Sequence, residues 1–254
     1  MALKVSILYP HVVTSSDAES KGPAFYAPYQ KRFVATYDQF RPGYPHTLRP
    51  ILCSPSMEDA TEAMALYSPT ADDSIEFEWY CGGGWDVGAH QSTAIGLDCD
   101  LVVCCATPTH FREDNWLLPI AEAFEKYGDG LYGTSASYQN MPHIRGGCFA
   151  FSPDAMRRYP NVIDSREKSF YFESGQSPIA IKPDWCFTNW MLAQGKTAKF
   201  VTRDGCYDLA DWRKPANIFR RGDQSNALAW DRHYDIYAAA DPAEKAVLEK
   251  LADG

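Results

Sequence analysis

Apolar residues recur along the first half of the chain in short runs that have the length of β-strands. The run 101–106 (LVVCCA) is apolar at every position, which is typical of a strand covered on both faces. The other early runs are 4–9, 49–53 and 75–80. These four runs predict four strands, of which 101–106 is the most deeply buried.

Between the strand-like runs, apolar residues return at the spacing of an α-helix, as in Tyr29, Phe33 and Tyr37. The predicted helices are 29–40, 57–66 behind a cap at Ser56, 87–97 and 115–127. Strands that alternate with helices predict an α/β fold with a mostly parallel central sheet flanked by helices.

After Gly128 the strands become shorter, and turns rich in Tyr, Gly and Pro separate them. The elements expected in this half are strands at 131–133, 148–152 and 198–202, a helix at 184–194 and an amphipathic helix at the end. No repeat, low-complexity tract or linker divides the sequence. We therefore expect residues 1–254 to form a single Rossmann-like domain.

Composition narrows the class of protein. With 254 residues, 45% of them hydrophobic and 14% aromatic, the chain can build a sizeable core. No apolar run approaches the roughly eighteen residues that span a membrane. The first ten residues lack the charged, apolar and small-residue regions of a signal peptide. These features predict a cytoplasmic protein without a membrane span.

Charge and cysteine spacing argue against binding of duplex nucleic acid and against a zinc site. The net charge of −9 disfavours binding of duplex nucleic acid, which needs clustered Lys and Arg, although a local basic patch would still allow it. The eight cysteines form no CxxC pair and no zinc-ligand spacing. We expect them to be reduced thiols, as in other cytoplasmic proteins.

A glycine-rich segment, 82–88 (GGGWDVG), lies between a predicted strand and a predicted helix. Such turns bring backbone N–H groups at a helix N-terminus to an anion or a nucleotide. The dinucleotide fingerprint GxGxxG fails, because Val87 stands where the third glycine belongs. A tight bend alone would also explain the glycines. Asp86 favours the nucleotide, because an acidic residue at a helix start can bind a ribose or a base.

Two aspartates resemble a metal-binding DxD motif, but they lie at the wrong end of a strand. In open α/β sheets, ligands bind beyond the carboxyl ends of the strands. Asp98 and Asp100 precede the strand 101–106, whereas Thr107 and His110 follow it. Mg²⁺ and Mn²⁺ prefer carboxylate oxygens, which this second segment lacks until Glu113. The sequence therefore predicts no metal ligands, and dependence on Mn²⁺ or Mg²⁺ through a DxD is not supported.

Several segments together resemble GT-A-type glycosyltransferases, in particular bacterial enzymes that build capsule, O-antigen or rhamnan-like polysaccharides. They are the turn GWDVG at 84–88, the strand LVV at 101–103, Asp184 followed by Gly195, and the tail FRRGDQSNALAWDRHYDIY. The resemblance covers about residues 3–237. The chain departs from that group in lacking the DxD that normally ends the 101–106 strand.

The resemblance implies a single GT-A-like domain, in which 1–127 binds a nucleotide sugar and 128–254 binds the acceptor. Asp184 stands where inverting members carry the general base, and Glu173 is its rival. The positions implied to bind the donor are Tyr9, Pro10, His11 and Ser54 at the nucleobase, Asp86 at the nucleoside, and Thr107, His110, Arg145, Arg220 and Arg221 at the diphosphate. Without a metal, Arg, His or backbone N–H groups must balance the charge of the diphosphate.

Each of these residues also has a purely structural interpretation. Asp184 also fits the N-cap of the helix that follows it, His110 a core or turn histidine, and Arg220 with Arg221 a solvated surface. Six tryptophans would suit a sugar-stacking cleft or the core: Trp79, Trp85, Trp185, Trp190, Trp212 and Trp230.

The sequence thus favours a cytoplasmic glycosyltransferase of bacterial or phage type, most consistent with an inverting mechanism. It would move a sugar from a nucleotide diphosphate to a hydroxyl of a glycan, a lipid-linked glycan or a modified nucleobase. Two other classes compete with this hypothesis. One is a catalytically silent relative that binds nucleotide sugars, and the other is an NAD(P)-dependent oxidoreductase.

Overall fold

The structure is a computed structural model that describes residues 2–13, 22–56, 58–67 and 74–254. Its central strand, β5 (Leu101–Cys105), is buried at all five positions. β1 (Val5–Val12) runs parallel to β5 on one side and to β2 (Thr47–Cys53) on the other. β3 (Ser74–Ile75) and β4 (Glu78–Tyr80) both pair with β2 in parallel. The run 75–80 is therefore two short strands and not one.

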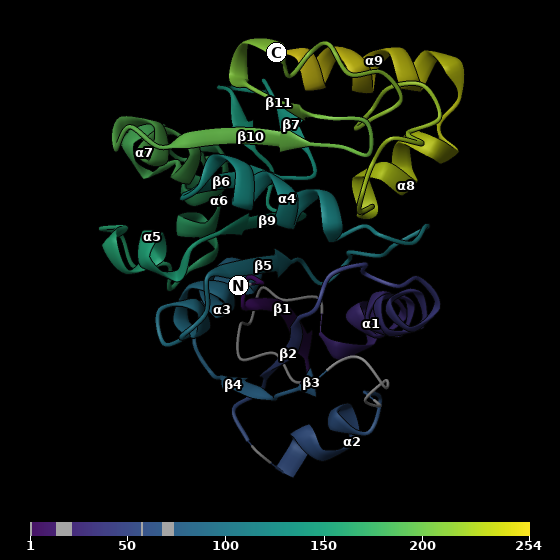
Figure 1. Cartoon of the computed structure of the whole chain (residues 1–254). Coiled ribbons are helices and arrows are strands. Elements are labelled where there is room, and N and C mark those ends of the chain that lie inside the picture. The colour runs from purple at the N-terminus through teal and green to yellow at the C-terminus, as the bar shows by residue number, and fades with distance from the viewer. Residues whose placement is uncertain (1, 14–21, 57, 68–73) are drawn as a thin grey trace.

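The second half of the chain continues the sheet on the other side of β5. β9 (Cys148–Phe151) runs antiparallel to β5 and to β6 (Gly130–Gly133). β10 (Thr197–Val201) is parallel to β6, and β11 (Cys206–Tyr207) closes the edge in the antiparallel direction. Within the described ranges these nine strands form one mixed, mostly parallel sheet, with β1 and β5 in its middle (Figure 1). The predicted α/β fold class is confirmed.

Helices cover both faces of the sheet, and the side chains of β5 alternate between them. Val102 and Cys104 pack under α3 (Trp85–Ala94), α5 (Pro153–Arg158), α6 (Arg166–Ser174) and α7 (Phe187–Ala193). Leu101, Val103 and Cys105 pack under α1 (Pro23–Gln39) and α4 (Leu118–Tyr127). Burial on both faces explains why the strand is apolar throughout.

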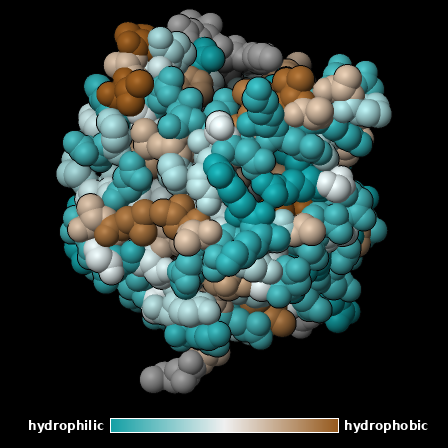
Figure 2. Space-filling view, turned by 90° about the horizontal axis from the view of Figure 1, so that it is seen from above, coloured by the Kyte–Doolittle hydropathy of each residue, from teal (hydrophilic) through white to brown (hydrophobic). Residues whose placement is uncertain are grey.

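The remaining elements are short or lie at the periphery. They are η1 (Glu58–Ala60), α2 (Thr61–Met64), β7 (Ala136–Ser137), β8 (His143–Ile144), η2 (Pro183–Trp185), η3 (Leu209–Asp211), α8 (Arg232–Ala239) and α9 (Pro242–Asp253). No helix in the part of the chain that the structure describes is long and apolar enough to cross a membrane. Seen from the β11 edge, the surface is largely hydrophilic, with apolar residues in short groups (Figure 2).

The boundaries of several predicted helices differ in the structure. The helix expected at 57–66 is η1 followed by the single turn of α2, and Met57 lies outside the described residues. The helix expected at 184–194 is interrupted, because η2 and α7 are separate elements. Three helices were not predicted from the sequence, because they have six to nine residues each and mix polar with apolar positions: α5, α6 and α8.

The glycine-rich turn between β4 and α3 packs against another part of the backbone. A Cβ on Gly83 would lie 2.2 Å from the carbonyl oxygen of Asp164, and one on Gly84 would lie 2.4 Å from that of Ile163. Gly84 also has a φ of +84°, a conformation that L-residues rarely adopt. Close contact with the 163–164 backbone therefore accounts for both glycines.

We predict that Gly84→Ala destabilises the protein far more than Gly195→Ala. Both glycines have positive φ, but a Cβ on Gly195 would meet nothing within 4 Å. The control should cost about 1–2 kcal/mol for its backbone conformation. Gly84→Ala should add roughly 1–3 kcal/mol for overpacking. Urea unfolding measures both, and equal losses would show that the contact with Ile163 is unimportant.

Candidate functional site

The carboxyl ends of the parallel strands meet at one edge of the sheet, which we call the carboxyl edge. β1, β2, β4 and β5 end there, and Ala106 and Thr107 follow β5. The N–H of Ala106 donates to the carbonyl oxygen of Gly147 at 2.8 Å. The loop that enters β9 therefore reaches the same edge, where ligands bind in open α/β sheets.

Asp86 fixes the start of α3 to the end of β5. Its Oδ2 accepts a hydrogen bond from the N–H of Thr107 at 2.8 Å, and its Oδ1 accepts one from Thr107 Oγ1 at 2.8 Å. Burial raises the pKa of Asp86, and the two hydrogen bonds from Thr107 act in the opposite direction. The carboxylate predicted to reach a nucleoside is thus bonded within the protein, and Thr107 is buried under it.

The other side chains predicted to contact a nucleobase form the floor of the carboxyl edge. Tyr9 is fully buried, stacks on Phe33 with ring centroids 3.5 Å apart, and donates its hydroxyl to the carbonyl oxygen of Thr107. His11 Nδ1 lies 2.8 Å from the hydroxyl of Tyr67, and burial lowers its pKa to about 4. The buried residues of this floor are Tyr9, Pro10, His11 and Ser54.

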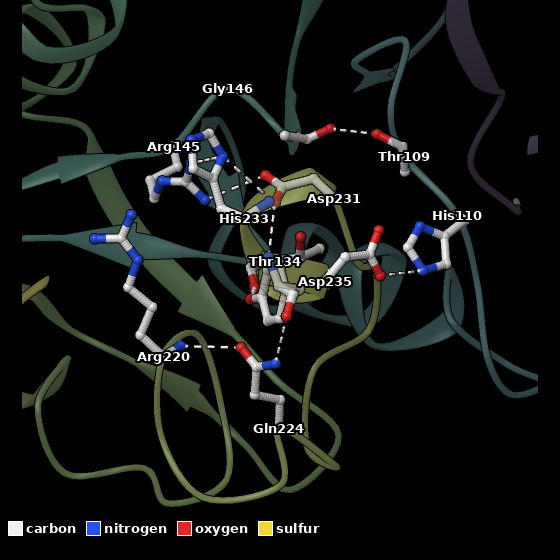
Figure 3. Close-up of polar contacts among 12 residues, drawn as sticks. Thr109, His110, Thr134, Arg145, Gly146, Arg220, Gln224, Asp231, His233 and Asp235 are labelled. Carbon is white, nitrogen blue, oxygen red and sulfur yellow. Dashed lines mark hydrogen bonds and ion pairs between the residues drawn. The ribbon is translucent and has the colours of Figure 1, made fainter. Parts of the chain in front are cut away.

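A buried ion pair between Arg145 and Asp231 lies next to the end of β5. Arg145 comes from the loop between β8 and β9, and its Nη1 donates to Asp231 Oδ2 at 3.2 Å. Its Nη2 lies 2.9 Å from Nδ1 of His233 (Figure 3). Burial alone would raise the pKa of Asp231, but the charge of Arg145 and hydrogen bonds from His233 hold that pKa below its usual value. Neither His233 nor Asp231 was predicted as a site residue from the sequence.

Asp231 also holds the C-terminal segment in place. It is the N-cap of α8, where its Oδ1 accepts hydrogen bonds from the N–H groups of His233 at 2.7 Å and Tyr234 at 3.2 Å. A Cβ on Gly147 would lie 2.7 Å from Asp231 Oδ2. The glycine is therefore needed for Asp231 to approach the carboxyl edge.

The adjacent residues Arg220 and Arg221 have different surroundings. The Arg220 guanidinium lies 4.8 Å from the ring centroid of Phe219, whose ring is also 4.1 Å from the Arg145 guanidinium. Arg221 instead pairs with Asp253 and donates to the carbonyl oxygen of Arg213 at 3.0 Å. Of the two predicted arginines, only Arg220 comes close to Arg145.

His110 is separated from these arginines. Its backbone pairs with Trp230 in an isolated bridge, and its Nε2 lies 3.5 Å from Asp235 Oδ1. Burial lowers the pKa of His110 to about 4, against the opposing effect of Asp235. In Figure 3 it lies beside Asp235, apart from Arg145 and Arg220. Its buried position in the bridge agrees with the simpler interpretation of a core histidine.

The two candidate bases lie in different environments. Glu173, on α6, accepts a hydrogen bond at Oε1 from the N–H of Gly146 at 3.1 Å, which holds it at the carboxyl edge. Asp184 is exposed within η2. α7 has Cys186 as its N-cap, so the interpretation of Asp184 as the cap of that helix is wrong.

The six candidate tryptophans differ in how far their side chains are exposed to solvent. Trp212 and Trp230 are buried, and Trp185 and Trp190 pack partly buried against the core. Trp79 and Trp85 remain 48% and 39% exposed. Of these two, Trp85 begins α3 beside the carboxyl edge.

Asp98 and Asp100 lie at the amino end of β5, as their direction in the sequence predicted. Lys4 pairs with Asp98 at 3.2 Å and donates its N–H to Asp100 at 2.8 Å. A cavity of about 400 Å³ opens on this side, lined in part by Lys4, Arg49 and Trp79. Arg49 is paired with Glu76 and Glu78. We place the functional site at the carboxyl edge, because ligands bind beyond the carboxyl ends of parallel strands and because Lys4 and Arg49 at this cavity are already paired with carboxylates.

The segment that follows β5 does not supply the ligands of a hard divalent cation. Mg²⁺ and Mn²⁺ need several oxygen ligands, usually including carboxylates. The hydroxyl of Thr107 already donates to Asp86, and no carboxylate follows β5 before Glu113. Among the residues that the structure describes, no group of three or more His, Cys, Asp or Glu could hold a metal ion.

No protein-family model matches the sequence, and no curated protein matches it. Solved structures match in part of their fold, among them a mannosyltransferase and a xylosyltransferase. The mannosyltransferase PcManGT from Pyrobaculum calidifontis, solved with GDP-Man and Mn²⁺, has a TM-score of 0.44 and 11% identity over 65% of this chain. Mouse xyloside xylosyltransferase 1 has a TM-score of 0.46 and 10% identity over 76% of this chain.

A third match is HddC from Yersinia pseudotuberculosis, with a TM-score of 0.39 and 13% identity over 71% of this chain. The chain spans half the length of the mannosyltransferase, 83% of the xylosyltransferase and 87% of HddC. Similarity at this level does not extend to donor, acceptor or metal.

We predict that Asp231→Ala strongly destabilises the protein. The substitution leaves Arg145 buried without its partner, which costs about 3–5 kcal/mol, and it also removes the cap of α8. Because the pKa of Asp231 is held below its ordinary value of 3.8, its contribution is complete above that pH and is lost as the pH falls further. Urea unfolding at pH 7 measures the loss.

Asp98→Ala is the control for this prediction. Asp98 is fully exposed in its pair with Lys4, so its removal should leave the unfolding midpoint unchanged. A wild-type midpoint for Asp231→Ala would show that Arg145 does not depend on this carboxylate.

Proposed function

We propose that this chain transfers a sugar from a nucleoside-diphosphate sugar to a hydroxyl group of an acceptor. One observation carries the proposal: Arg145 and Glu173 lie on either side of Gly146 at the carboxyl edge. Arg145 immediately precedes Gly146, and Glu173 accepts the hydrogen bond from the Gly146 N–H. A buried cation and a carboxylate are thereby held along one edge of the sheet.

Glycosyl transfer needs these two groups in different roles. The leaving diphosphate gains negative charge as its bond to the sugar breaks, and a guanidinium can balance that charge through paired hydrogen bonds. The acceptor hydroxyl becomes a better nucleophile when a carboxylate takes its proton. We assign the first role to Arg145 and the second to Glu173.

The proposed reaction inverts the anomeric carbon. Glu173 takes the proton of the acceptor hydroxyl, and the acceptor oxygen forms a bond to that carbon. The bond from the carbon to the phosphate oxygen breaks, and its electron pair leaves with the diphosphate. Glu173 is preferred over Asp184 because the Gly146 N–H holds it at the carboxyl edge, whereas Asp184 is exposed in η2.

We place the donor across the carboxyl ends of the first strands. Its nucleoside would lie over the floor formed by Tyr9, Pro10, His11 and Ser54, next to Asp86. Its diphosphate would lie beside Arg145, near the end of β5. Residues 1–127 would then bind the donor, and 128–254 would supply Glu173 and the acceptor side.

The two competing classes differ in what they bind. A silent relative would share the donor site without turnover. An oxidoreductase would need room for a dinucleotide pyrophosphate at the glycine-rich turn, where the carbonyl groups of Ile163 and Asp164 already pack. This contact favours the transferase over the oxidoreductase.

Thermal shift assays with UDP-, GDP- and dTDP-sugars, and with NAD⁺ and NADP⁺, test the proposal. One nucleotide sugar should raise the melting temperature, because a ligand at 100 times its Kd adds about 2.7 kcal/mol of stability. NAD⁺ and NADP⁺ should have no effect. A shift with a dinucleotide and none with any nucleotide sugar would refute the transferase, and binding without hydrolysis or transfer would identify a silent relative.

We predict that Glu173→Gln lowers the rate of donor hydrolysis or transfer by about 10²–10⁴-fold, the usual contribution of a general base. Donor binding in the thermal shift assay should stay within about twofold of wild type, because the amide keeps the size of the side chain and can accept from Gly146. Asp184→Asn is the paired variant and should retain the wild-type rate. The opposite pattern would transfer the role of base to Asp184.

A further inference from the structure

Two buried arginines at the carboxyl edge share a single buried carboxylate. Arg145 and Arg220 are each 8% exposed, and Asp231 is 5% exposed. Burial and the charge of Arg145 both lower the pKa of Arg220, and Asp231 opposes them. One carboxylate cannot balance two guanidinium groups, and an unbalanced buried charge is unfavourable. The cluster therefore carries an excess positive charge that an anion would neutralise.

Arg220 also has an unused hydrogen-bond donor. Its Nη1 donates to the carbonyl oxygen of Leu248 at 3.5 Å, which is long for a hydrogen bond. Its Nε is buried and has no hydrogen-bond partner among the described residues. Buried donors in native proteins are almost always paired, so an unpaired one at a cationic cluster indicates a missing acceptor.

Hydrogen bonds with neighbouring residues fix the position of Arg220. Its backbone has a φ of +53°, which is unfavourable for a non-glycine residue. The N–H of Arg220 donates to Oε1 of Gln224 at 3.1 Å, and Gln224 Nε2 donates to the carbonyl oxygen of Tyr234 at 3.0 Å (Figure 3). These bonds hold the strained residue beside α8, as is common where a side chain serves a ligand.

The cluster is open to solvent on one side and joined to the carboxyl edge on the other. The side chain of His233, next to Arg145, is 48% exposed. Asp231 packs directly over Gly147, whose carbonyl oxygen accepts from Ala106 at the end of β5. An anion bound beside Arg145 and His233 would therefore lie next to the loop that meets the end of β5.

We infer that Arg145, Arg220 and His233 form the binding site for the diphosphate of the donor, and that they neutralise it without a divalent cation. This inference rests on the proposed function. Guanidinium groups present planar pairs of N–H donors that match phosphate oxygens. The guanidinium groups of Arg145 and Arg220 lie 4.1 Å and 4.8 Å from the centroid of the Phe219 ring, and we assign one of them to each phosphoryl group. His110 and Arg221, which have other partners, take no part.

Isothermal titration of the full chain with inorganic pyrophosphate, UDP and GDP, all in EDTA, tests the inference. Pyrophosphate and at least one nucleoside diphosphate should bind to the wild type. Arg220→Ala should raise their Kd at least tenfold. Arg220→Lys keeps the charge but loses the planar donors, so it should have an intermediate effect and also serves if the alanine variant fails to fold.

Arg203→Ala is the matched control, because it removes one partly buried arginine that pairs with Glu113 away from the cluster. Its Kd values should stay within twofold of wild type. Unchanged binding in both Arg220 variants, or binding that appears only with Mn²⁺ and is lost in EDTA, would overturn the inference while leaving the proposed function standing. Failure of the wild type to bind any nucleotide sugar, nucleoside diphosphate or pyrophosphate, with or without Mn²⁺, would refute both.

Discussion

The carboxylate of Asp231 contacts α8, Arg145 and Gly147, and so connects parts of the molecule that are far apart in the sequence. It caps α8, accepts from the guanidinium of Arg145, and packs against Gly147 at the end of β5. Because the two arginines are buried, the site depends on this negative charge, which pairs with Arg145 and also acts electrostatically on Arg220. The C-terminal segment therefore contributes side chains to the functional edge, namely Asp231 and His233.

A second carboxylate fixes the opposite side of the same edge. Asp86 holds Thr107 by two hydrogen bonds and so ties the start of α3 to the end of β5. The glycines before it let the turn pack on the 163–164 backbone, which leads into α6 and to Glu173. The position of the proposed base thus depends on contacts that begin in the glycine-rich turn.

The sequence was most informative where burial repeats in a regular pattern. The all-apolar run of β5 indicated a central strand, and the direction of that strand placed Asp98 and Asp100 away from the functional edge. It could not separate Arg220 from Arg221, because their difference arises from a single backbone angle and from the partner Asp253. His233 was missed because only the fold of α8 brings it to Arg145, 88 residues away. An aspartate followed by a helical pattern at 231 was the one available signal for that cap.

A crystal structure with a nucleoside-diphosphate sugar, grown without divalent cations, tests the central claim most directly. The account predicts the diphosphate between Arg145 and Arg220, with an oxygen within hydrogen-bond distance of Arg220 Nε, and the anomeric carbon facing Glu173. A diphosphate bound instead in the cavity at the amino ends of the strands, beside Lys4 and Arg49, would contradict it.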